Sequence, residues 1–236
     1  MSLLHTRNLT AFYGDFQALF GINFAVDSGE TVAIIGANGA GKSTFLRSLT
    51  GLLINDADAI RFKGKAIGAL PANHIVGAGI AMVPEGRKLF PSLSVEENLK
   101  IGNYSGREGP WSVERIMDLF PFMRQRRHNP GAALSGGQQQ MVAIGRALMS
   151  NPDLLLCDEI SLGLAPTVIK DIYDTLPAIQ ETGTTVVVVE QDIQQAMAVA
   201  DRVYCFMEGR VTLEGPPGNL SHDAIREAYF GLKGAV

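Results

Sequence analysis

A glycine-rich stretch near the start of the chain, Gly36 to Thr44, constrains the fold more than any other feature. Its letters, GANGAGKST, match the phosphate-binding loop pattern, in which a glycine and four further residues precede Gly-Lys-Ser/Thr. Gly39 and Gly41 can take positive φ angles and turn their backbone N–H groups inward around an anion. A helix that we expect to begin near Lys42 points its positive end at the same anion.

The side chains and flanks of this loop strengthen the prediction. Lys42 can reach the β- and γ-phosphates of a nucleotide, and the Ser43 hydroxyl is placed to ligate Mg²⁺. An apolar, β-rich run at 31–35 precedes the loop and a helical run at 45–49 follows it, so an ordinary glycine-rich turn is the weaker interpretation. The loop residues expected to bind a nucleotide are Gly36, Asn38, Gly39, Ala40, Gly41, Lys42, Ser43 and Thr44.

Composition describes a globular chain with room for a substantial core. The 236 residues can form one large α/β domain or two small ones, with 46% hydrophobic and 19% charged residues. A net charge of −4 argues against general nucleic-acid binding, which needs a basic surface. No apolar run reaches about eighteen residues, and the first residues lack a signal-peptide pattern, so we expect neither a membrane span nor secretion.

The cysteines and histidines indicate no transition-metal site. Cys157 and Cys205 lie in apolar runs typical of buried strands, where reduced core thiols are a better interpretation than a disulfide. The four histidines are scattered along the chain and show no metal-ligand spacing.

Two adjacent carboxylates, Asp158 and Glu159, follow the apolar run that begins at Asp153. In parallel α/β sheets, ligands bind at the carboxyl ends of the strands. Asp158 is suited to hold Mg²⁺ through its shell, and Glu159 to polarise a water for in-line attack on a γ-phosphate. An acidic strand end facing solvent is the alternative, which the phosphate loop upstream disfavours.

Helical patterns dominate from about Ser94 to Ser150. Within this segment, the stretch 134–140 places a small polar residue and two glycines at the start of a helix. It is either a second anion site or a plain capped helix. The basic cluster 124–128 is either a solvated helix end, which we favour, or a docking patch.

Strands and helices alternate along the rest of the chain, which predicts a largely parallel sheet covered on both faces. We expect the strands 3–12, 18–26, 58–67 (with a turn), 80–83, 153–158, 184–189 and 203–207, and a last strand ending at 214. We expect helices after Pro71, at 113–120, 141–149, 166–182 (kinked or interrupted by Pro177), 193–200 and 221–230, the last stopped by Gly231.

Three motifs taken together resemble those of the ATP-binding subunit of ABC transporters. They are the phosphate loop, Leu134-Ser135-Gly136-Gly137-Gln138 and Asp158-Glu159, and the likeness covers essentially the whole chain. Finer stretches resemble the smaller ATPase of branched-chain amino acid importers; they are 83–87, 161–166, 189–191 and 228–231. Urea and short-chain amide importers have similar subunits and remain alternatives.

The resemblance implies a P-loop ABC ATPase fold with three parts. A nucleotide-binding α/β core, with a mainly parallel sheet and an N-terminal antiparallel β subdomain, would take 1–90 and 151–236, and an inserted helical subdomain would take 91–150. Tyr13 would stack on adenine, although from the residues alone a half-buried strand residue is the favoured interpretation.

The resemblance also implies partners. Two ATPase subunits would pair head to tail, each lending Ser135, Gly136 and Gly137 to the γ-phosphate held by the other. A groove around Glu85 would receive a short helix from a membrane permease, and a periplasmic solute-binding protein would belong to the same system. The subunit would lie in the cytoplasm against the inner face of the membrane and bind no nucleic acid.

This chain departs from the wider family pattern at four positions, which are Glu85, Ile160, Ala165 and Gln191. Glu85 replaces a glutamine; it would repel phosphate yet could attract Mg²⁺. Gln191 stands at the switch-histidine position, where an amide can donate a hydrogen bond to a γ-phosphate but cannot titrate. We therefore expect a distinct ATPase partner, with a second copy of this chain as the alternative. A nucleotide-sensing module with weak hydrolysis and a soluble ABC ATPase outside transport are the rival interpretations.

Overall fold

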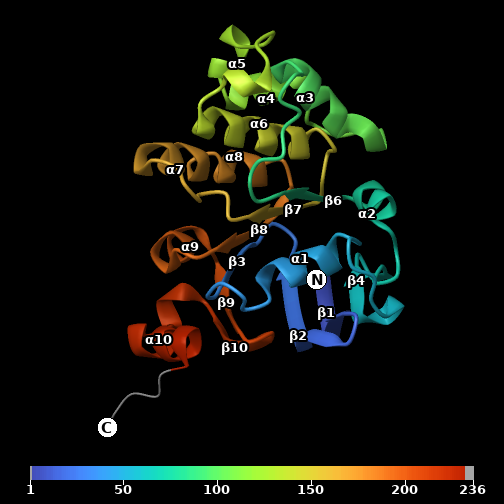
Figure 1. The fold of residues 1–236 in the computed structure, drawn as a ribbon, viewed down its shortest axis with the longest axis vertical. Coiled ribbons are helices and arrows are strands. Elements are labelled where there is room, and N and C mark those ends of the chain that lie inside the picture. The colour runs from blue at the N-terminus through green and yellow to red at the C-terminus, as the bar shows by residue number, and fades with distance from the viewer. Residues whose placement is uncertain (1, 232–236) are drawn as a thin grey trace. The chain divides into compact units, whose positions relative to one another are not determined.

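The computed structural model describes residues 2–231, and the chain divides into two compact units. The first unit combines Met1–Ile75 with Thr185–Val236, and the second is Val76–Thr184. Figure 1 labels the elements of both, and each unit is described separately below.

The first unit begins with an antiparallel sheet ordered β2-β1-β4-β5. Its long hairpin pairs β1 (Ser2–Tyr13) with β2 (Phe16–Asp27), which confirms the two predicted N-terminal strands. The short strands β4 (Ile60–Phe62) and β5 (Lys65–Ala66) follow the 3-10 turn η1 (Ala57–Ala59). This is the predicted N-terminal antiparallel subdomain.

Parallel strands form the second sheet of this unit. β3 (Thr31–Ile35) pairs in parallel with β8 (Thr185–Glu190) and with β9 (Arg202–Met207), whereas β10 (Arg210–Gly215) is antiparallel to β9. Every residue of β3 and β8 is buried, as expected for parallel strands covered on both faces.

The helices of the first unit follow the sequence pattern closely. They are α1 (Lys42–Leu49), α9 (Ile193–Val199), the 3-10 turn η4 (Pro217–Asn219) and α10 (His222–Phe230). Gly231 ends α10 in the left-handed conformation, as the sequence predicts. Phe45 of α1 packs edge-on against two rings of the core. Its ring centroid lies 5.1 Å from that of Phe24 and 5.3 Å from that of Phe206, and these contacts hold α1 against the sheets.

The second unit pairs two parallel strands, β6 (Ile80–Val83) and β7 (Leu154–Asp158), and is otherwise mainly helical. Its helices are α3 (Val95–Ile101), η2 (Gly102–Ser105), α4 (Val113–Leu119), α5 (Phe122–Gln125), η3 (Gly131–Ala133), α6 (Gly136–Leu148), α7 (Pro166–Tyr173) and α8 (Leu176–Gln180). The helix α2 (Ala72–Ala78) crosses the boundary between the two residue ranges.

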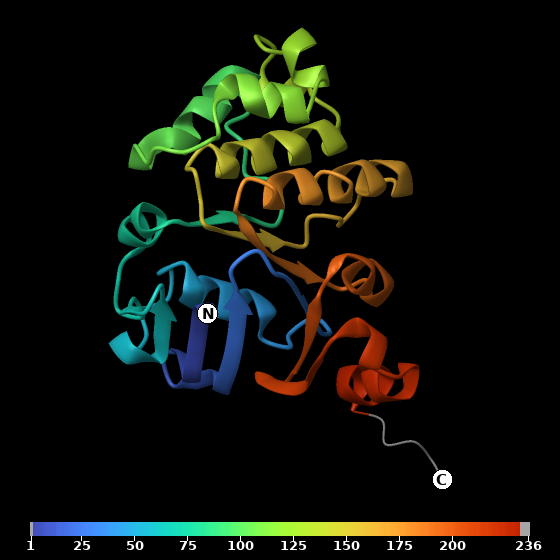
Figure 2. The ribbon, with the colours of Figure 1, turned by 180° about the vertical axis from the view of Figure 1, so that it is seen from behind.

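Local sequence signals set the ends of these helices. Ser94 and Ser135 each form a reciprocal capping box, with Glu97 and Gln138 respectively. The predicted interruption near Pro177 is confirmed, because α7 ends at Tyr173 and α8 begins three residues later. Figures 1 and 2 show α6 lying between the α3–α4 pair and the α7–α8 pair.

Both cysteines are buried in strands, and neither takes part in a disulfide. Cys157 lies in β7 and Cys205 in β9. Burial raises the pKa of the Cys205 thiol, which keeps it protonated and unreactive. The predicted burial of both cysteines is confirmed.

Candidate nucleotide-binding site

The phosphate loop connects the end of β3 to the start of α1. Gly39 and Gly41 have φ angles of 81° and 101°, so glycine supplies the left-handed backbone there. Gly41 is the N-cap of α1 and forms no side-chain cap, and its carbonyl accepts from the Phe45 amide at 2.9 Å. The first N–H groups of α1 are therefore offered to an anion rather than to a capping side chain.

The turn between β9 and β10 hydrogen-bonds to the phosphate loop. The amide of Gly209 donates to the Ala40 carbonyl at 3.0 Å, and its own carbonyl accepts from Phe20 at 2.9 Å. A Cβ on Gly36 would lie 2.4 Å from the Phe206 carbonyl oxygen, so the loop passes too close to β9 for any side chain. The loop is thus held in shape by the first unit's own backbone.

Lys42 is almost fully buried, and its ammonium group folds back onto the loop. Its Nζ donates to the Gly36 carbonyl at 2.6 Å and to the Ala37 carbonyl at 3.2 Å. Ser43, next in sequence, is exposed in the first turn of α1. The cation is therefore fixed at the centre of the loop, where phosphate oxygens would replace neutral carbonyls as its partners.

Gln191 lies at the same sheet edge as the loop. It follows Glu190, the last residue of β8, which pairs with Ile35, the last residue of β3. Because these strands are parallel and adjacent, both chains leave the sheet at one edge. The Gln191 carbonyl also accepts a 3.5 Å hydrogen bond from Tyr229 of α10. The first unit thus brings together two of the predicted segments.

Tyr13 ends β1 at the tip of the long hairpin and pairs there with Phe16. Its side chain is 42% exposed, and those of Phe12 and Phe16 are 48% and 69% exposed. Three solvent-accessible aromatic rings at one hairpin tip provide surface for stacking. The exposure of Tyr13 fits the interpretation as a half-buried strand residue and also leaves its ring available for stacking.

In the second unit, Ser135, Gly136 and Gly137 form the N-terminus of α6. Ser135 accepts from the Gln138 amide at 3.3 Å and donates its own amide to the Gln138 side chain at 3.1 Å. Each of these two side chains thus accepts a hydrogen bond from the backbone amide of the other residue. The amides of the two glycines remain at the positive end of a thirteen-residue helix.

Asp158 and Glu159 occupy the carboxyl end of β7. Asp158 is buried, and Glu159 has a φ of 47°, an unusual left-handed conformation for a residue with a side chain. Such strain costs on the order of 1–3 kcal/mol and concentrates at functional sites. Val83 of β6 pairs with Cys157, so Glu85 leaves the sheet at the same edge as these two carboxylates.

Sequence reasoning missed the shape of the segment that follows Glu85. Gly86, Arg87 and Lys88 have φ angles of 72°, 65° and 46°, so three successive residues are left-handed. Only the glycine signals such a turn in the sequence. The carbonyls of Arg87 and Lys88 accept hydrogen bonds from Arg146 of α6, 58 to 59 positions later in the chain.

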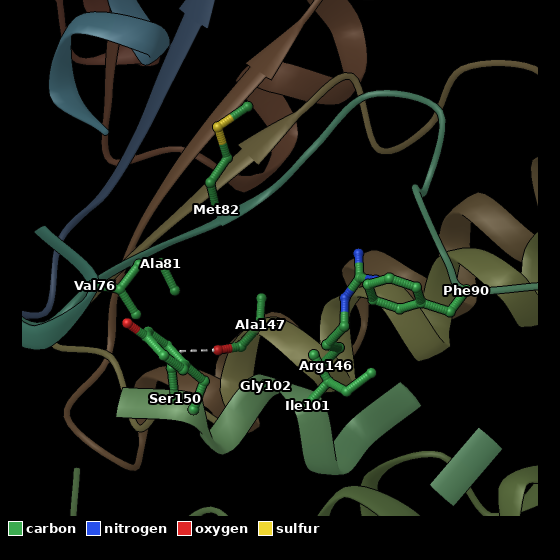
Figure 3. A pocket seen from close by; sticks show the side chains of 10 residues that line it. Val76, Ala81, Met82, Phe90, Ile101, Gly102, Arg146, Ala147 and Ser150 are labelled. Carbon is green, nitrogen blue, oxygen red and sulfur yellow. Dashed lines mark hydrogen bonds between the residues drawn. The ribbon is translucent and has the colours of Figure 1, made fainter. Parts of the chain in front are cut away.

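A groove of about 330 Å³ includes Arg146 in its lining (Figure 3). The resemblance implied a groove around Glu85, but Glu85 does not line this one. Its lining includes Met82 of β6, Phe90, Ile101, Tyr104 and Arg146. Phe90, Ile101 and Tyr104 are 47%, 41% and 73% exposed. Three large exposed apolar side chains in one hollow mark a contact surface rather than ordinary scattered exposure.

Two arginines of the basic cluster 124–128 form ion pairs with carboxylates of the same chain. Arg127 donates two hydrogen bonds to the Glu96 carboxylate, from Nε and from one terminal nitrogen, both at 2.7 Å. A terminal nitrogen of Arg124 lies 2.5 Å from a carboxylate oxygen of Asp118. These pairs, and the exposure of Arg124, Arg126 and His128, fit the favoured interpretation of this cluster as a solvated helix end.

Across residues 2–231, no three His, Cys, Asp or Glu side chains are grouped as a metal site. None of the helices in the described part of the chain is long and apolar enough to span a membrane.

Comparison with known proteins agrees with this geometry. The family model for ABC transporters matches residues 19–161. The chain is 41% identical to the high-affinity branched-chain amino acid transport ATP-binding protein BraG of Pseudomonas aeruginosa, over 97% of this chain and 100% of that protein.

Two solved structures are also similar. A nucleotide-free ATP-binding cassette from an ABC transporter is 28% identical, with a TM-score of 0.84 over 97% of this chain and 95% of that one. A dimeric cassette in a post-hydrolysis state, bound to ADP and Pi, is 28% identical, with a TM-score of 0.80 over 91% of this chain and 98% of that one.

Proposed function

Because the chain belongs to the ABC transporter family and is an ATPase of that family, we propose that it powers an importer of branched-chain amino acids. The observation that carries this proposal is the likeness to BraG, which runs through the full length of both proteins.

The solute class is tested by uptake in cells. A strain that lacks this subunit but keeps the rest of its transport system should regain uptake of labelled leucine, isoleucine or valine when the chain is restored. Lys42→Ala should not restore uptake, because the cation in the phosphate loop is lost. If urea or a short-chain amide is taken up instead, the chain serves the alternative importer class.

At the nucleotide, the amides of the phosphate loop and Lys42 hold the β- and γ-phosphates, and Tyr13 stacks on the adenine. Ser43 and Asp158 offer a hydroxyl and a buried carboxylate, an all-oxygen donor set of the kind that suits Mg²⁺. Glu85 is a further carboxylate available to this ion. The metal, when bound, neutralises charge on the phosphates.

Glu159 acts as the base that polarises the attacking water. Gln191 donates an amide hydrogen bond toward the γ-phosphate, and it cannot titrate as a histidine would. A nucleotide-sensing module with weak hydrolysis is the rival function that Glu85 and Gln191 favour. Phosphate release by the assembled transporter separates the two: an importer ATPase turns over continuously, and a sensor does not.

The complete site takes a second ATPase subunit. Ser135, Gly136 and Gly137 present a helix N-terminus, which closes on the γ-phosphate held by the partner. That partner is a distinct ATPase with the usual residues at the positions of Glu85 and Gln191, so the two sites of the pair are unequal.

The rate of ATP hydrolysis by the isolated chain tests whether the partner is a distinct ATPase. The purified chain should hydrolyse ATP at least tenfold more slowly than the assembled transporter. Equal rates would show that two copies of this chain suffice and would contradict a distinct partner.

The groove beside Phe90 receives a short helix from a membrane permease, which places this subunit at the cytoplasmic face of the membrane. A periplasmic solute-binding protein delivers the solute to the same system. Co-purification of the chain with integral membrane subunits checks this assembly, and a fully monomeric protein in cell extracts would contradict it.

A further inference from the structure

The turn that follows Glu85 is strained. Left-handed backbone suits Gly86, but Arg87 and Lys88 carry a Cβ that crowds the neighbouring carbonyl in this conformation. The turn is closed by the Arg87 amide, which donates to the Pro84 carbonyl at 3.3 Å across Glu85. Such a conformation persists only where its surroundings hold it.

Arg146 is the side chain that holds it. Its two terminal nitrogens donate to the Lys88 carbonyl at 2.7 Å and to the Arg87 carbonyl at 3.0 Å. One planar guanidinium therefore binds the carbonyls of both strained residues. Burial lowers the pKa of Arg146 below its ordinary value, yet a guanidinium stays charged near neutral pH.

The same guanidinium also faces the groove. It lies over the ring of Phe90, 5.9 Å from its centroid, and both side chains line the hollow (Figure 3). Whatever enters the groove and presses on Phe90 therefore meets the group that fixes the turn.

The turn reaches the other end of α6 as well. The guanidinium nitrogens of Arg87 lie 3.1 and 3.2 Å from the place where a Cβ on Gly136 would stand. Gly136 and Arg146 are ten residues apart, or about 15 Å along the helix axis. The strained turn thus contacts α6 both at the Ser-Gly-Gly end and at the groove.

We propose that Arg146 is a positioning residue for ATP turnover, which holds the turn at Gly86–Lys88 and through it fixes Glu85 and the Gly136 end of α6. A permease helix in the groove then acts on the nucleotide-binding segments through this arginine. The inference rests on the proposed function, because it assumes that the chain hydrolyses ATP and that the groove is the permease contact.

Kinetics of the assembled transporter test the proposal. Arg146→Ala should lower kcat for ATP at least tenfold and change the KM for ATP by less than twofold, because the phosphate loop is untouched. Arg146→Lys should resemble Arg146→Ala, since a lysine cannot bind both carbonyls in one plane. Arg115→Ala, which removes the arginine 5.3 Å over the Trp111 ring, is the matched control and should leave kcat within twofold.

A rescue variant separates positioning from a loss of folding. Lys88→Gly removes the side chain that strains the turn, so the turn needs Arg146 less. Added to Arg146→Ala, it should restore kcat at least fivefold. Lys63→Gly, at an exposed left-handed residue of the N-terminal sheet, should restore nothing in the same background.

Three results would overturn the proposal: unchanged kcat in Arg146→Ala, no rescue by Lys88→Gly, or loss of permease from purified Arg146→Ala transporter that Lys88→Gly does not repair. Its failure is distinguishable from failure of the proposed function. If Glu159→Gln abolishes turnover and Arg146→Ala does not, only the positioning role is wrong. If the restored wild-type chain supports no uptake of leucine, isoleucine or valine, the proposed function is wrong, whatever the kinetics of Arg146→Ala.

Discussion

Two glycines of the phosphate loop face different constraints, although both have positive φ. A Cβ on Gly41 would lie 2.9 Å from a methyl group of Leu19 and 3.2 Å from the Cα of Gly209. A Cβ on Gly39 would meet nothing within 4 Å. Backbone strain applies to both residues, whereas crowding applies only to Gly41.

We expect Gly41→Ala to destabilise the protein by on the order of 3 kcal/mol, because strain and overpacking add there. Gly39→Ala should cost about 1 kcal/mol, which is the backbone strain alone. Chemical denaturation of the purified variants without nucleotide measures both. Equal losses would contradict the packing of the loop against Leu19 and the β9–β10 turn.

Glu96 gives a prediction about pH. Its carboxylate hydrogen-bonds with Arg127 and Lys100, which lowers its pKa to about 2 from an ordinary 4.5. A lowered pKa stabilises the folded state above pH 4.5, and this contribution is lost as the pH falls toward 2. Glu96→Gln should therefore lower stability at pH 7 and have progressively less effect below pH 4.5.

Denaturation of wild type and variant between pH 7 and pH 3 measures this. Asp118→Asn is the control, because its pair with Arg124 is largely exposed and should contribute little at any pH. A Glu96→Gln effect that is the same at pH 7 and pH 3 would show that the ion pair is not its source.

At the scale of elements, α6 is the helix whose packing most restricts which side chains it can carry. It packs on α3 and α7 through glycines as well as through large side chains. A Cβ on Gly137 would lie 2.4 Å from a methyl group of Val168 in α7, whereas one on Gly136 would meet the guanidinium group of Arg87 at 3.1 Å. Gly137 thus serves packing against α7 in addition to its proposed role at a phosphate.

Gly137→Ala should therefore destabilise the nucleotide-free protein by about 1–3 kcal/mol, because α6 and α7 must separate. Gly136→Ala should cost less, and Val168→Ala added to Gly137→Ala should recover most of the loss. Thermal or chemical unfolding gives the comparison. If the two glycine variants lose equal stability and Val168→Ala recovers none, α6 is not packed against α7 at this point.

The sequence predicts most elements of this fold because their signals are local. Alternation marks β1, solid apolar runs mark β3 and β8, and Pro177 and Gly231 mark where helices stop. The left-handed turn after Glu85 was missed because two of its three residues are not glycine. The distant side chain of Arg146 supports that turn, and no local pattern reports such a contact.

At the scale of the whole molecule, the phosphate loop and the segment of Gln191 belong to one compact unit. Glu85, the Ser-Gly-Gly end of α6 and Asp158-Glu159 belong to the other. Spacing of motifs along the chain predicted each segment, since every motif is short and tied to a strand end or helix start. The identity of the ATPase partner and of the solute cannot be predicted in this way, because the residues that decide them lie on other chains.

We propose that this chain binds ATP through its phosphate loop and hydrolyses it with Glu159 as the base. The most direct measurement compares ATP binding and phosphate release in assembled transporter that carries Glu159→Gln. We predict ATP affinity within threefold of wild type and turnover reduced at least a hundredfold, with Lys42→Ala losing turnover and the ATP bound at this chain's own phosphate loop. Glu159→Gln that fails to bind ATP, or that still releases phosphate at the wild-type rate, would contradict the claim.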